Sequence, residues 1–574
     1  MTYHHGLSTT PRDSFYEQLN KRTPVGVDTE TVSISNRTLL GIGVAFSQTE
    51  AYYVTPNSHE FDAVLGVLRD KSRRKIYHNA PFDLRVLRKY DVDIDEVDDT
   101  ALMARLKPED SAVLEDVSFW LHPFGHHQTQ TVSHLMAQYK VRKFTDLPAD
   151  VIAEKCCKDA KAAYGLFFKY KDEISMSYYE GLRVLIGPLE RISRQGIRLD
   201  QDVLQILYDD YSFESTCLHA LFRRMGFNIN SRYELGYTLS ERGNALPFLP
   251  KSGLLATDED NLIRLDDPLV WPILRCRDID KKLSTYIKPW LGKERAYTTL
   301  RMEAATGRLN SSNAGELEDD RNLQNIPKVA DSGSKHHIRS AFIPDNGVFT
   351  FADKSQLELR ILAYRSGDEY MLNVFKNDGD LHEDTSKRMN LPRVRAKNLN
   401  FGIPYGADVA AVMKVINKDT AQIIRDPSIV AEQIELWYRT YPQAAQYFTD
   451  QEQFGLDNGY VMTTGGRKMR IPWELGEKHG RNCCRNYPIQ GTAAEDVFAL
   501  MRWVVQETSW LEVTRLQIHD ELMHDGLVEY PDMVLNETKT AKEGYKVYDV
   551  KGELAYLTSD YYLPIEVSVK ERWG

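Results

Sequence analysis

The sequence contains little cysteine and no long apolar run. Six cysteines among 574 residues are too few for a scaffold held by disulfides, and none forms a C-x-x-C pair. A reducing compartment is therefore the expected setting. No apolar stretch approaches the roughly 18 residues that a membrane span requires, and the amino terminus opens with polar residues. These absences exclude a disulfide-rich secreted module and an integral membrane protein, and they predict a cytoplasmic localisation.

The sequence also has no excess of positive charge. Asp and Glu outnumber Lys and Arg by 83 to 72, and the formal net charge is −11. This balance argues against a general basic coat for nucleic acid. A nucleic-acid channel needs positive potential only along its own walls, and cations do cluster locally, as at Arg393, Arg395 and Lys397. The position of such clusters therefore decides whether nucleic acid is a partner.

The length predicts more than one domain, and the pattern of the first block is that of an α/β unit. Residues 24–54 contain short alternating apolar runs typical of two or three strands. Apolar residues then recur at helical spacing from about 60 to 175. We expect an α/β unit that opens with a hairpin and ends near residue 175.

The remainder of the chain is predicted to be an α+β body. Residues 176–290 have mostly helical patterns, with a loop-like interval at 243–267 that is rich in Gly, Pro, Asn and Asp. Strands are expected at 349–352 and 513–518, and long helical stretches at 431–447 and 493–507. The sequence contains neither internal repeats nor low-complexity tracts.

Four carboxylates of the first block have the pattern of a metal site. Asp28 and Glu30 are two residues apart on a predicted strand, so both side chains lie on one face. Asp83 and Asp159 follow beside helical patterns. Together the four acids can hold two divalent ions that activate a water and stabilise the leaving oxygen in phosphodiester hydrolysis. For any single acid, a solvated charge or a helix cap is the better interpretation.

Asp353 and Asp520 are the candidate metal ligands of the second block. Asp353 ends an apolar strand and precedes a helix, so it is placed to bind a metal, and a role as the N-cap of that helix is compatible with metal binding. Asp520 and Glu521 directly follow a β-favouring run, in the setting of a tight turn. Only the tertiary fold can bring the two segments together. If it does, they form a two-metal centre for phosphoryl transfer.

Between these acids lies a segment suited to a nucleotide. Two cations and two aromatics recur at intervals of four: Arg393, Lys397, Phe401 and Tyr405. On a helix they form one slowly drifting stripe, which suits a triphosphate tail and a stacked base. A basic stripe alone is usually solvated, and aromatics at this spacing usually belong to a core. Pro404 should end the helix before Tyr405.

The first block resembles the DEDD exonuclease superfamily over residues 24–170. The resemblance lies in Asp28-x-Glu30, Asn79-x-x-Phe-Asp83 and an acid, Asp159, expected to open a final helix. In the polymerase I branch, a tyrosine four residues before the last Asp orients the attacking water, whereas Lys155 stands here. Lys155 either contacts the scissile phosphate or points to solvent, in which case Tyr164 is a candidate to position the water. Asp99 is interpreted as structural.

The second block resembles, in order, the motifs of family A DNA polymerases, the family of bacterial polymerase I and many phage replicases. The matching positions run from Thr306 to Glu521, with Asn486–Ala494 between the helical stripe and the last acids. The resemblance implies template-directed DNA synthesis from dNTPs, with 3′→5′ proofreading, in replication or repair. Primer-template DNA and dNTPs are the implied partners, and a replisome or processivity partner is left open. Mg²⁺ is the implied cofactor, with two ions per active site and Mn²⁺ as a substitute.

The resemblance assigns roles residue by residue. The implied polymerase metal ligands are Asp353 and Asp520, supported by Glu521, and the implied exonuclease ligands are Asp28, Glu30, Asp83 and Asp159. The implied dNTP contacts are Arg393, Lys397, Phe401, Tyr405, His382, Gln356 and Glu358, of which Glu358 crowds the sugar 2′ position. The implied DNA contacts are Arg308, Asn486, Gln490, His519 and Gln517.

The implied fold is multidomain, α/β and α+β. An RNase H-like exonuclease domain (1–175) precedes a right-hand polymerase domain (176–574). Its parts are expected as a thumb at 176–300, a palm at 301–375 and 485–574, and fingers at 376–484. A 5′-nuclease is not expected before the exonuclease, and such a compact form resembles phage enzymes, which would place the protein in a host cytoplasm.

Three departures from the family pattern stand out. Lys354 replaces the aromatic that usually follows the first catalytic Asp. Asn482 stands where the family has an arginine, between Arg481 and Arg485. Acidic residues are inserted before Asn322, namely Glu316, Glu318, Asp319 and Asp320. Two rival functions stay open: an exonuclease whose second block only binds DNA, and a non-catalytic nucleic-acid scaffold.

Overall fold

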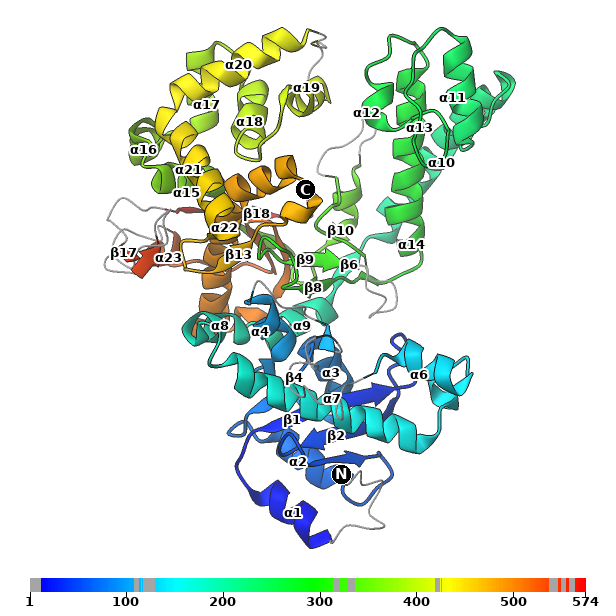
Figure 1. The fold of residues 1–574 in the computed structure, drawn as a ribbon. Helices are drawn as coiled ribbons and strands as arrows, with labels where there is room; N and C mark the ends of the chain where they lie inside the picture. Colours follow the sequence, from blue (N-terminus) through cyan, green and yellow to red (C-terminus); the bar gives the residue numbers. More distant parts are fainter. Residues whose placement is uncertain are drawn as a thin grey trace.

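The computed structural model shows an N-terminal body and a larger second body with two helical arms (Figure 1). It describes residues 12–107, 113–114, 116, 130–312, 321–327, 336–418, 424, 426–535, 546–548, 554–556 and 563–573. A continuous apolar core contains residues of both bodies. Among the described residues, no helix has the length and apolarity needed to cross a bilayer.

A mixed sheet forms the centre of the N-terminal body. Its strand order is β3-β2-β1-β4-β5, with β1 at Val25–Thr31, β2 at Leu39–Ala45, β3 at Ala51–Val54, β4 at Lys75–Tyr77 and β5 at Asp98–Asp99. The first three strands are antiparallel, and β4 and β5 run parallel to β1. The predicted α/β unit with an opening hairpin is therefore confirmed.

Helix α7 (Ala149–Tyr170) lies across β1 and β2 (Figure 1). Two glycines permit this close packing. A Cβ on Gly26 would lie 2.2 Å from the carbonyl oxygen of Ala160, and one on Gly43 would lie 2.7 Å from that of Cys156. The expectation that Asp159 opens this helix is wrong, because the helix begins ten residues earlier, at Ala149. Asp159 therefore lies in mid-helix, over the sheet.

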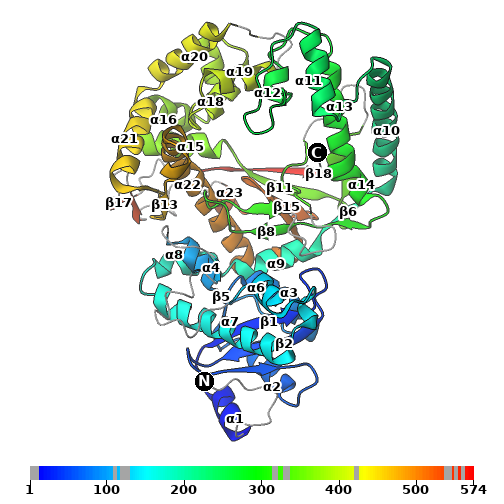
Figure 2. The same ribbon diagram turned by 45° about the vertical axis from the view of Figure 1, so that its right-hand side comes forward.

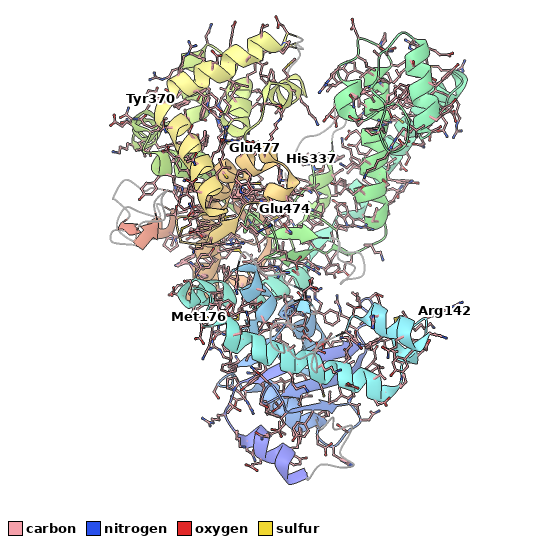
Figure 3. The ribbon with its side chains drawn as sticks, in the orientation of Figure 1. Arg142, Met176, His337, Tyr370, Glu474 and Glu477 are labelled. Carbon is pink, nitrogen blue, oxygen red and sulfur yellow. The ribbon has the colours of Figure 1, made fainter. Side chains whose placement is uncertain are left out.

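Shorter helices surround this sheet. They are α1 (Arg12–Asn20), α2 (Phe61–Arg69), α3 (Ala80–Leu87), η1 (Arg88–Tyr90), α4 (Thr100–Arg105), α6 (Val132–Tyr139) and η3 (Phe144–Asp146). Arg142 marks the segment between α6 and η3 (Figure 3).

Two helices form the junction between the bodies. Met176 begins α8 (Met176–Arg183), and α9 (Ile186–Gln195) follows directly (Figure 3). The fully buried Glu190 of α9 accepts hydrogen bonds from Arg88 at 2.5 Å and from Arg85 at 3.3 Å. Buried ion pairs and apolar packing therefore hold the N-terminal body against the second one.

One helical arm follows the junction. It contains α10 (Gln201–Arg224), α11 (Arg232–Glu241), α12 (Glu259–Leu262), α13 (Val270–Lys282), η4 (Leu283–Ile287) and α14 (Lys288–Trp290). The interval 243–267 was expected as a loop, and α12 is the one helix within it. Arg242 stabilises this interval by pairing with Asp267 at 2.7 Å.

An antiparallel sheet forms the base of the second body (Figure 2). Its strand order is β14-β15-β11-β18, with β11 at Phe349–Lys354, β14 at Thr514–Ile518, β15 at Glu521–Asp525 and β18 at Ile565–Lys570. The strands predicted at 349–352 and 513–518 are thus confirmed. Smaller sheets are formed by β10 (Phe342–Ile343), β6 (Ile197–Leu199) and β7 (Arg295–Ala296), by β8 (Thr299–Arg301) with β9 (Asn310–Ser312), by β12 (Tyr460–Met462) with β13 (Lys468–Arg470), and by β16 (Lys546–Tyr548) with β17 (Leu554–Tyr556).

A second helical arm rises on the opposite side of this sheet (Figures 1 and 2). It contains α15 (Leu357–Ser366), α16 (Glu369–Lys376), α17 (Leu381–Met389), α18 (Arg393–Gly402), α19 (Val409–Lys418), α20 (Pro427–Thr440) and α21 (Pro442–Asn458), and it packs on α22 (Glu477–Glu507). The helical stretches expected at 431–447 and 493–507 are confirmed, but the first is divided between α20 and α21 at Tyr441. Pro442 starts a new helix there because its ring removes the backbone donor.

Candidate active sites

The acids of the second body meet at the edge of the β11–β15 strand pair. Asp353 on β11 lies directly opposite Glu521 on β15. The backbone N–H of Lys354 donates to the carbonyl of Asp520 at 3.1 Å. His519 has a left-handed conformation, with φ of 55°, which closes the tight turn between β14 and β15. The fold therefore brings together the two acidic segments that sequence alone leaves apart.

Asp353 is not the cap of the following helix. Helix α15 begins at Leu357, and Gln356 occupies its N-cap position. The amide oxygen of Gln356 instead accepts the backbone N–H of Leu381 at 3.0 Å, at the start of α17. The alternative interpretation of Asp353 as a helix cap is therefore wrong, and Gln356 links two helices of the arm.

Four of the predicted contact residues form one hydrogen-bonded network. Glu358 on α15 binds the guanidinium of Arg308 and accepts the phenolic hydrogen of Tyr405. The amide of Gln490 on α22 donates to the Tyr405 oxygen at 2.7 Å. Burial and the neighbouring Glu358 raise the pKa of Tyr405, so the phenol keeps its proton. Segments far apart in sequence thus hold the Glu358 carboxylate in one position.

The stripe of cations and aromatics lies on the exposed side of α18. Arg393, Lys397 and Phe401 are exposed, and the Lys397 ammonium is 6.0 Å from the centre of the Phe401 ring. Arg393 forms an ion pair with Asp380. The helix ends at Gly402, as Pro404 predicted, and Tyr405 lies beyond it. The cations therefore remain accessible to a ligand, while Tyr405 belongs to the Glu358 network.

His382 lies beneath this stripe and is neutral at pH 7. Its ring centre is 5.3 Å from that of Phe401, and its Nδ1 is 3.1 Å from the amide nitrogen of Asn400. Burial, with the charges of Lys397 and Arg393, lowers the pKa of His382 to about 4. Any contact that His382 makes with a phosphate is therefore a neutral hydrogen bond.

The remaining predicted DNA contacts lie along β14 and α22. Gln324 donates to the backbone carbonyl of Gln517 at 2.9 Å, while His519 is exposed in the turn. Asn486 lies half-buried on α22. Its neighbour Arg485 pairs with Glu452 of α21. Arg481 binds the same glutamate at 2.9 Å, so both arginines are engaged beside Asn482. The acidic insertion (Glu316, Glu318, Asp319 and Asp320) lies outside the described residues.

Lys354 points away from the acids beside it. Its ammonium is completely buried and lies 2.9 Å from Asp496 of α22, whose side chain is 3% exposed. The lysine that replaces the usual aromatic therefore connects β11 to α22 by a buried ion pair. Sequence reasoning missed Asp496, because nothing local to it indicates a distant lysine.

The four acids of the first body converge from three elements. Asp28 and Glu30 share one face of β1, because side chains alternate along a strand, and they lie opposite Gly43 and Gly41 of β2. Asp159 faces them from α7, while Asp83 on α3 accepts the backbone N–H of Thr29 at 2.9 Å and its hydroxyl at 2.7 Å. Burial and then the charges of Asp159 and Glu30 raise the pKa of Asp28. Such mutual repulsion is what a bound cation relieves.

The donors of this cluster fit a hard divalent ion. The Oδ2 atom of Asp28 is buried and has no hydrogen-bond partner among the described residues. Ligand atoms of Asp28, Glu30 and Cys156 all lie within 4.8 Å of one another. Burial and the neighbouring carboxylates raise the pKa of the Cys156 thiol, so it stays protonated. Carboxylate oxygens thus remain the donors, which are the ligands that Mg²⁺ and Mn²⁺ prefer.

Lys155 points into this cluster. Its ammonium is 3.0 Å from Glu30 Oε1 and 2.6 Å from Asp159 Oδ2. The alternative that Lys155 points to solvent is therefore wrong. Tyr164 packs instead beside Gly26 and against Phe168.

Two neighbours of the cluster have other roles. Tyr53 lies beside the cluster and was not predicted from the sequence. Burial and the adjacent Cys156, Glu30 and Asp28 raise the pKa of its phenol, so the phenol keeps its proton. Its position in a strand was the only available signal. Asp99 has the structural role expected of it, since it accepts the backbone N–H groups of Asn79 at 2.9 Å and Ala101 at 2.9 Å.

Comparisons with known proteins agree with these two bodies. The profile of DNA polymerase family A matches residues 210–554, and that of a 3′-5′ exonuclease matches residues 8–161. DNA polymerase I of Caldicellulosiruptor bescii is 33% identical over 399 residues, which cover 64% of this chain and 45% of the relative. DNA polymerase I of Chloroflexus aurantiacus is 29% identical over 575 residues, which cover 91% and 58%. The chain thus spans about half the length of these relatives.

A solved structure shares the fold over nearly the whole chain. It is the POL domain of Pol1 from M. smegmatis in complex with DNA primer-template and dNTP. The TM-score is 0.73 at 21% sequence identity, and the match covers 98% of this chain and 97% of the other.

Proposed function

The chain belongs to DNA polymerase family A and carries a 3′-5′ exonuclease domain, and on that premise we propose that it extends primers on a DNA template and removes misincorporated nucleotides. Primer-template DNA and dNTPs are the proposed substrates. Replication or repair of DNA in the cytoplasm is the proposed setting. Phage replication and a replisome partner remain predictions from the sequence resemblance.

Synthesis is proposed to occur at Asp353, Asp520 and Glu521. The primer 3′-oxygen attacks the α-phosphorus of a dNTP, the bond to the β-phosphate oxygen breaks, and pyrophosphate leaves. Asp353 and Asp520 would hold two Mg²⁺ ions, with Mn²⁺ as a substitute, which stabilise the developing charge when bound. The observation that carries this proposal is the alignment of Asp353 opposite Glu521, beside the turn that contains Asp520.

The incoming nucleotide is proposed to lie between α18 and the Glu358 network. Arg393 and Lys397 are exposed cations suited to a triphosphate. Glu358, held by Arg308 and Tyr405, is fixed in position and would exclude a 2′-hydroxyl. Gln490, Asn486, His519 and Gln517 are proposed to contact the template or primer.

Hydrolysis is proposed to occur at the carboxylates of the first body. Asp28, Glu30, Asp83 and Asp159 would hold Mg²⁺, which supplies charge stabilisation at the scissile phosphate when bound. Two observations support the assignment. The acids converge, and the buried Asp28 Oδ2 atom has no hydrogen-bond partner among the described residues, so its lone pairs are available to a metal ion. The Lys155 ammonium contacts two of these acids, Glu30 and Asp159.

Primer extension with and without dNTPs tests the proposal. With dNTPs the protein should lengthen a primer, and without them it should shorten a single strand from its 3′ end. Shortening without any extension would favour an exonuclease whose second body only binds DNA. Binding with neither reaction would favour a non-catalytic scaffold.

A further inference from the structure

The exonuclease cluster contains a positive charge of its own. The Lys155 ammonium contacts one oxygen of Glu30, at 3.0 Å, and one of Asp159, at 2.6 Å. Its side chain is 11% exposed, and those of the two acids are 9% and 7% exposed. Lys155 and Asp159 are four residues apart on α7, so the helix itself sets their separation. The lysine is therefore a built part of the site.

The Lys155 ammonium occupies the position that a divalent ion bound by both Glu30 and Asp159 would need. Mg²⁺ binds carboxylate oxygens at about 2.0–2.1 Å and requires near-octahedral geometry. An ion there would compete with the ammonium for the same two oxygens and would lie beside a like charge. The Asp28 side of the cluster differs, because Asp28 Oδ2 has no hydrogen-bond partner among the described residues. A divalent ion is therefore accommodated on that side.

We propose that Lys155 is a resident cation that takes the place of one of two divalent ions, so that the exonuclease site binds a single ion on the Asp28 side. This inference rests on the proposed exonuclease activity. In the hydrolysis, the water oxygen forms a bond to phosphorus, the bond to the 3′-oxygen breaks, and a proton from the water ends on that oxygen. The Lys155 charge stabilises the negative charge that develops on the phosphate and the leaving oxygen.

A cavity adjoins Lys155 on the side of α6. Lys155 lines this cavity of about 160 Å³ between α6 and α7, together with Gln138, Tyr139 and Lys158. The opposing interpretation is that Lys155 is only a counter-ion, which leaves when two ions bind. The two interpretations differ in the number of ions that the loaded site holds.

Counting bound Mn²⁺ by electron paramagnetic resonance distinguishes them. The full-length protein is titrated to saturation without DNA, and D28A/E30A gives the ions bound elsewhere. The wild type should hold one ion more than this double variant, and K155M should hold two more. K155R, which keeps the charge, should match the wild type. Equal counts in the wild type and K155M would overturn the proposal.

Lys169→Met is the matched control. It makes the same substitution on the same helix, at an ion pair with Glu173, and 14 residues along a helix correspond to about 21 Å. Its ion count should equal that of the wild type. Primer extension by each variant reports whether the rest of the chain is folded.

Single-strand degradation provides an independent measurement. In the subsaturating range the wild-type rate should rise with the first power of Mg²⁺ concentration and the K155M rate with the second power. At a Mg²⁺ concentration that fills only the Asp28 side of the site, the K155M rate should be roughly 100-fold below that of the wild type, because neither the ammonium nor a second ion then stabilises charge at the scissile phosphate. K155R should restore most of that rate. A wild type that degrades no single strands would refute the proposed exonuclease function, whereas the ion count would still test the place of Lys155.

Discussion

The two sites use lysine beside their acids in opposite ways. The N-terminal body is called the exonuclease body, and the second body the polymerase body. Lys155 of the exonuclease body points into the carboxylate cluster and pairs with Glu30 and Asp159. Lys354 is the direct neighbour of Asp353 in the polymerase body, yet its ammonium is buried against Asp496. Both lysines replace an aromatic residue of the family pattern. The difference shows that the tertiary surroundings, rather than the substitution itself, decide whether a new cation enters a site.

The sites also differ in how deeply their acids are buried. The exonuclease acids lie beneath a helix, where burial and mutual repulsion raise the pKa of Asp28. The polymerase acids lie at a strand edge and a tight turn, and Asp353 and Asp520 are partly exposed. The cations proposed for the polymerase reaction lie on a separate helix, α18. The exonuclease site thus has the Lys155 ammonium among its acids, whereas the cations proposed for the polymerase site lie on a different element from its acids.

The largest expected effect separates the two activities. Asp353→Ala or Asp520→Ala should reduce primer extension by roughly 10³-fold or more, since several kcal/mol of charge stabilisation are lost. Single-strand degradation should stay unchanged. D28A/E30A should do the reverse. Parallel assays of both activities on these variants provide the measurement, and near-wild-type extension by either aspartate variant would remove that residue from the site.

The contrast between the two lysines predicts a stability effect. Asp496→Ala leaves the Lys354 ammonium buried without this carboxylate, and the free energy of unfolding of the polymerase body should fall by about 3–5 kcal/mol. The double variant K354M/D496L should recover most of that loss, because apolar groups can fill the same buried space. Urea unfolding is the measurement. A loss below about 1 kcal/mol for Asp496→Ala would be the value of a surface pair and would contradict the buried arrangement.

Substitution of Phe401 tests whether the nucleotide lies on the exposed side of α18. The phenyl ring offers no hydroxyl to replace the missing 3′-hydroxyl of a dideoxynucleotide, so the wild type should reject chain terminators. Phe401→Tyr should raise their relative use by roughly 10–150-fold, the value of a hydrogen bond to a charged group. Competition between a dideoxynucleotide and its dNTP measures the change. Equal use by both proteins would contradict the position of the nucleotide on this face.

Substitution of Glu358 tests whether its carboxylate excludes a 2′-hydroxyl. Glu358→Ala opens the space that a 2′-hydroxyl needs, and discrimination against ribonucleotides should fall by about 10–100-fold, equivalent to about 1.4–2.7 kcal/mol. Glu358→Gln keeps the volume and should keep most of the discrimination. The ratio of kcat/KM for dNTP and NTP is the measurement. If the alanine variant discriminates as the wild type does, another group excludes the ribose.

A change in pH should act on the two bodies in opposite directions. Burial raises the pKa of Asp83 to about 8, so in metal-free protein the folded exonuclease body binds a proton that the unfolded chain lacks at pH 5–8. Its stability should therefore rise as pH falls through this range. Burial lowers the pKa values of His382 and His524 to about 4. The unfolded chain then binds the extra protons, so the polymerase body should lose stability as pH falls from 6.5 to 4.

Hydrogen exchange of each body in a chelator, at pH 7.5 and pH 5, measures this divergence. Asp83→Asn should weaken the trend of the exonuclease body, to which the raised pKa of Asp28 also contributes, and His524→Gln should weaken that of the polymerase body. Parallel changes in both bodies would show that other groups dominate the pH response.

The sequence alone determined the features that depend on local geometry. The two-residue period of a strand placed Asp28 and Glu30 on one face, and the fixed ring of Pro404 ended the helix of the cation stripe. The order of the motifs was enough to predict the family and the fold class. The break at Pro442 follows from the same proline rule but was not predicted, and local pattern failed at Asp159, where the helix starts earlier than its motif.

The tertiary structure decided everything that depends on contacts between distant segments. It brought Asp520 beside Asp353, joined Arg308, Tyr405 and Gln490 around Glu358, and turned Lys354 toward Asp496. It also brought α7 close enough to β1, over glycines, for Lys155 to reach Glu30. Backbone dihedral preferences act within a few residues and are readable in sequence. The direction of a long side chain follows from which partner the packing places within its reach.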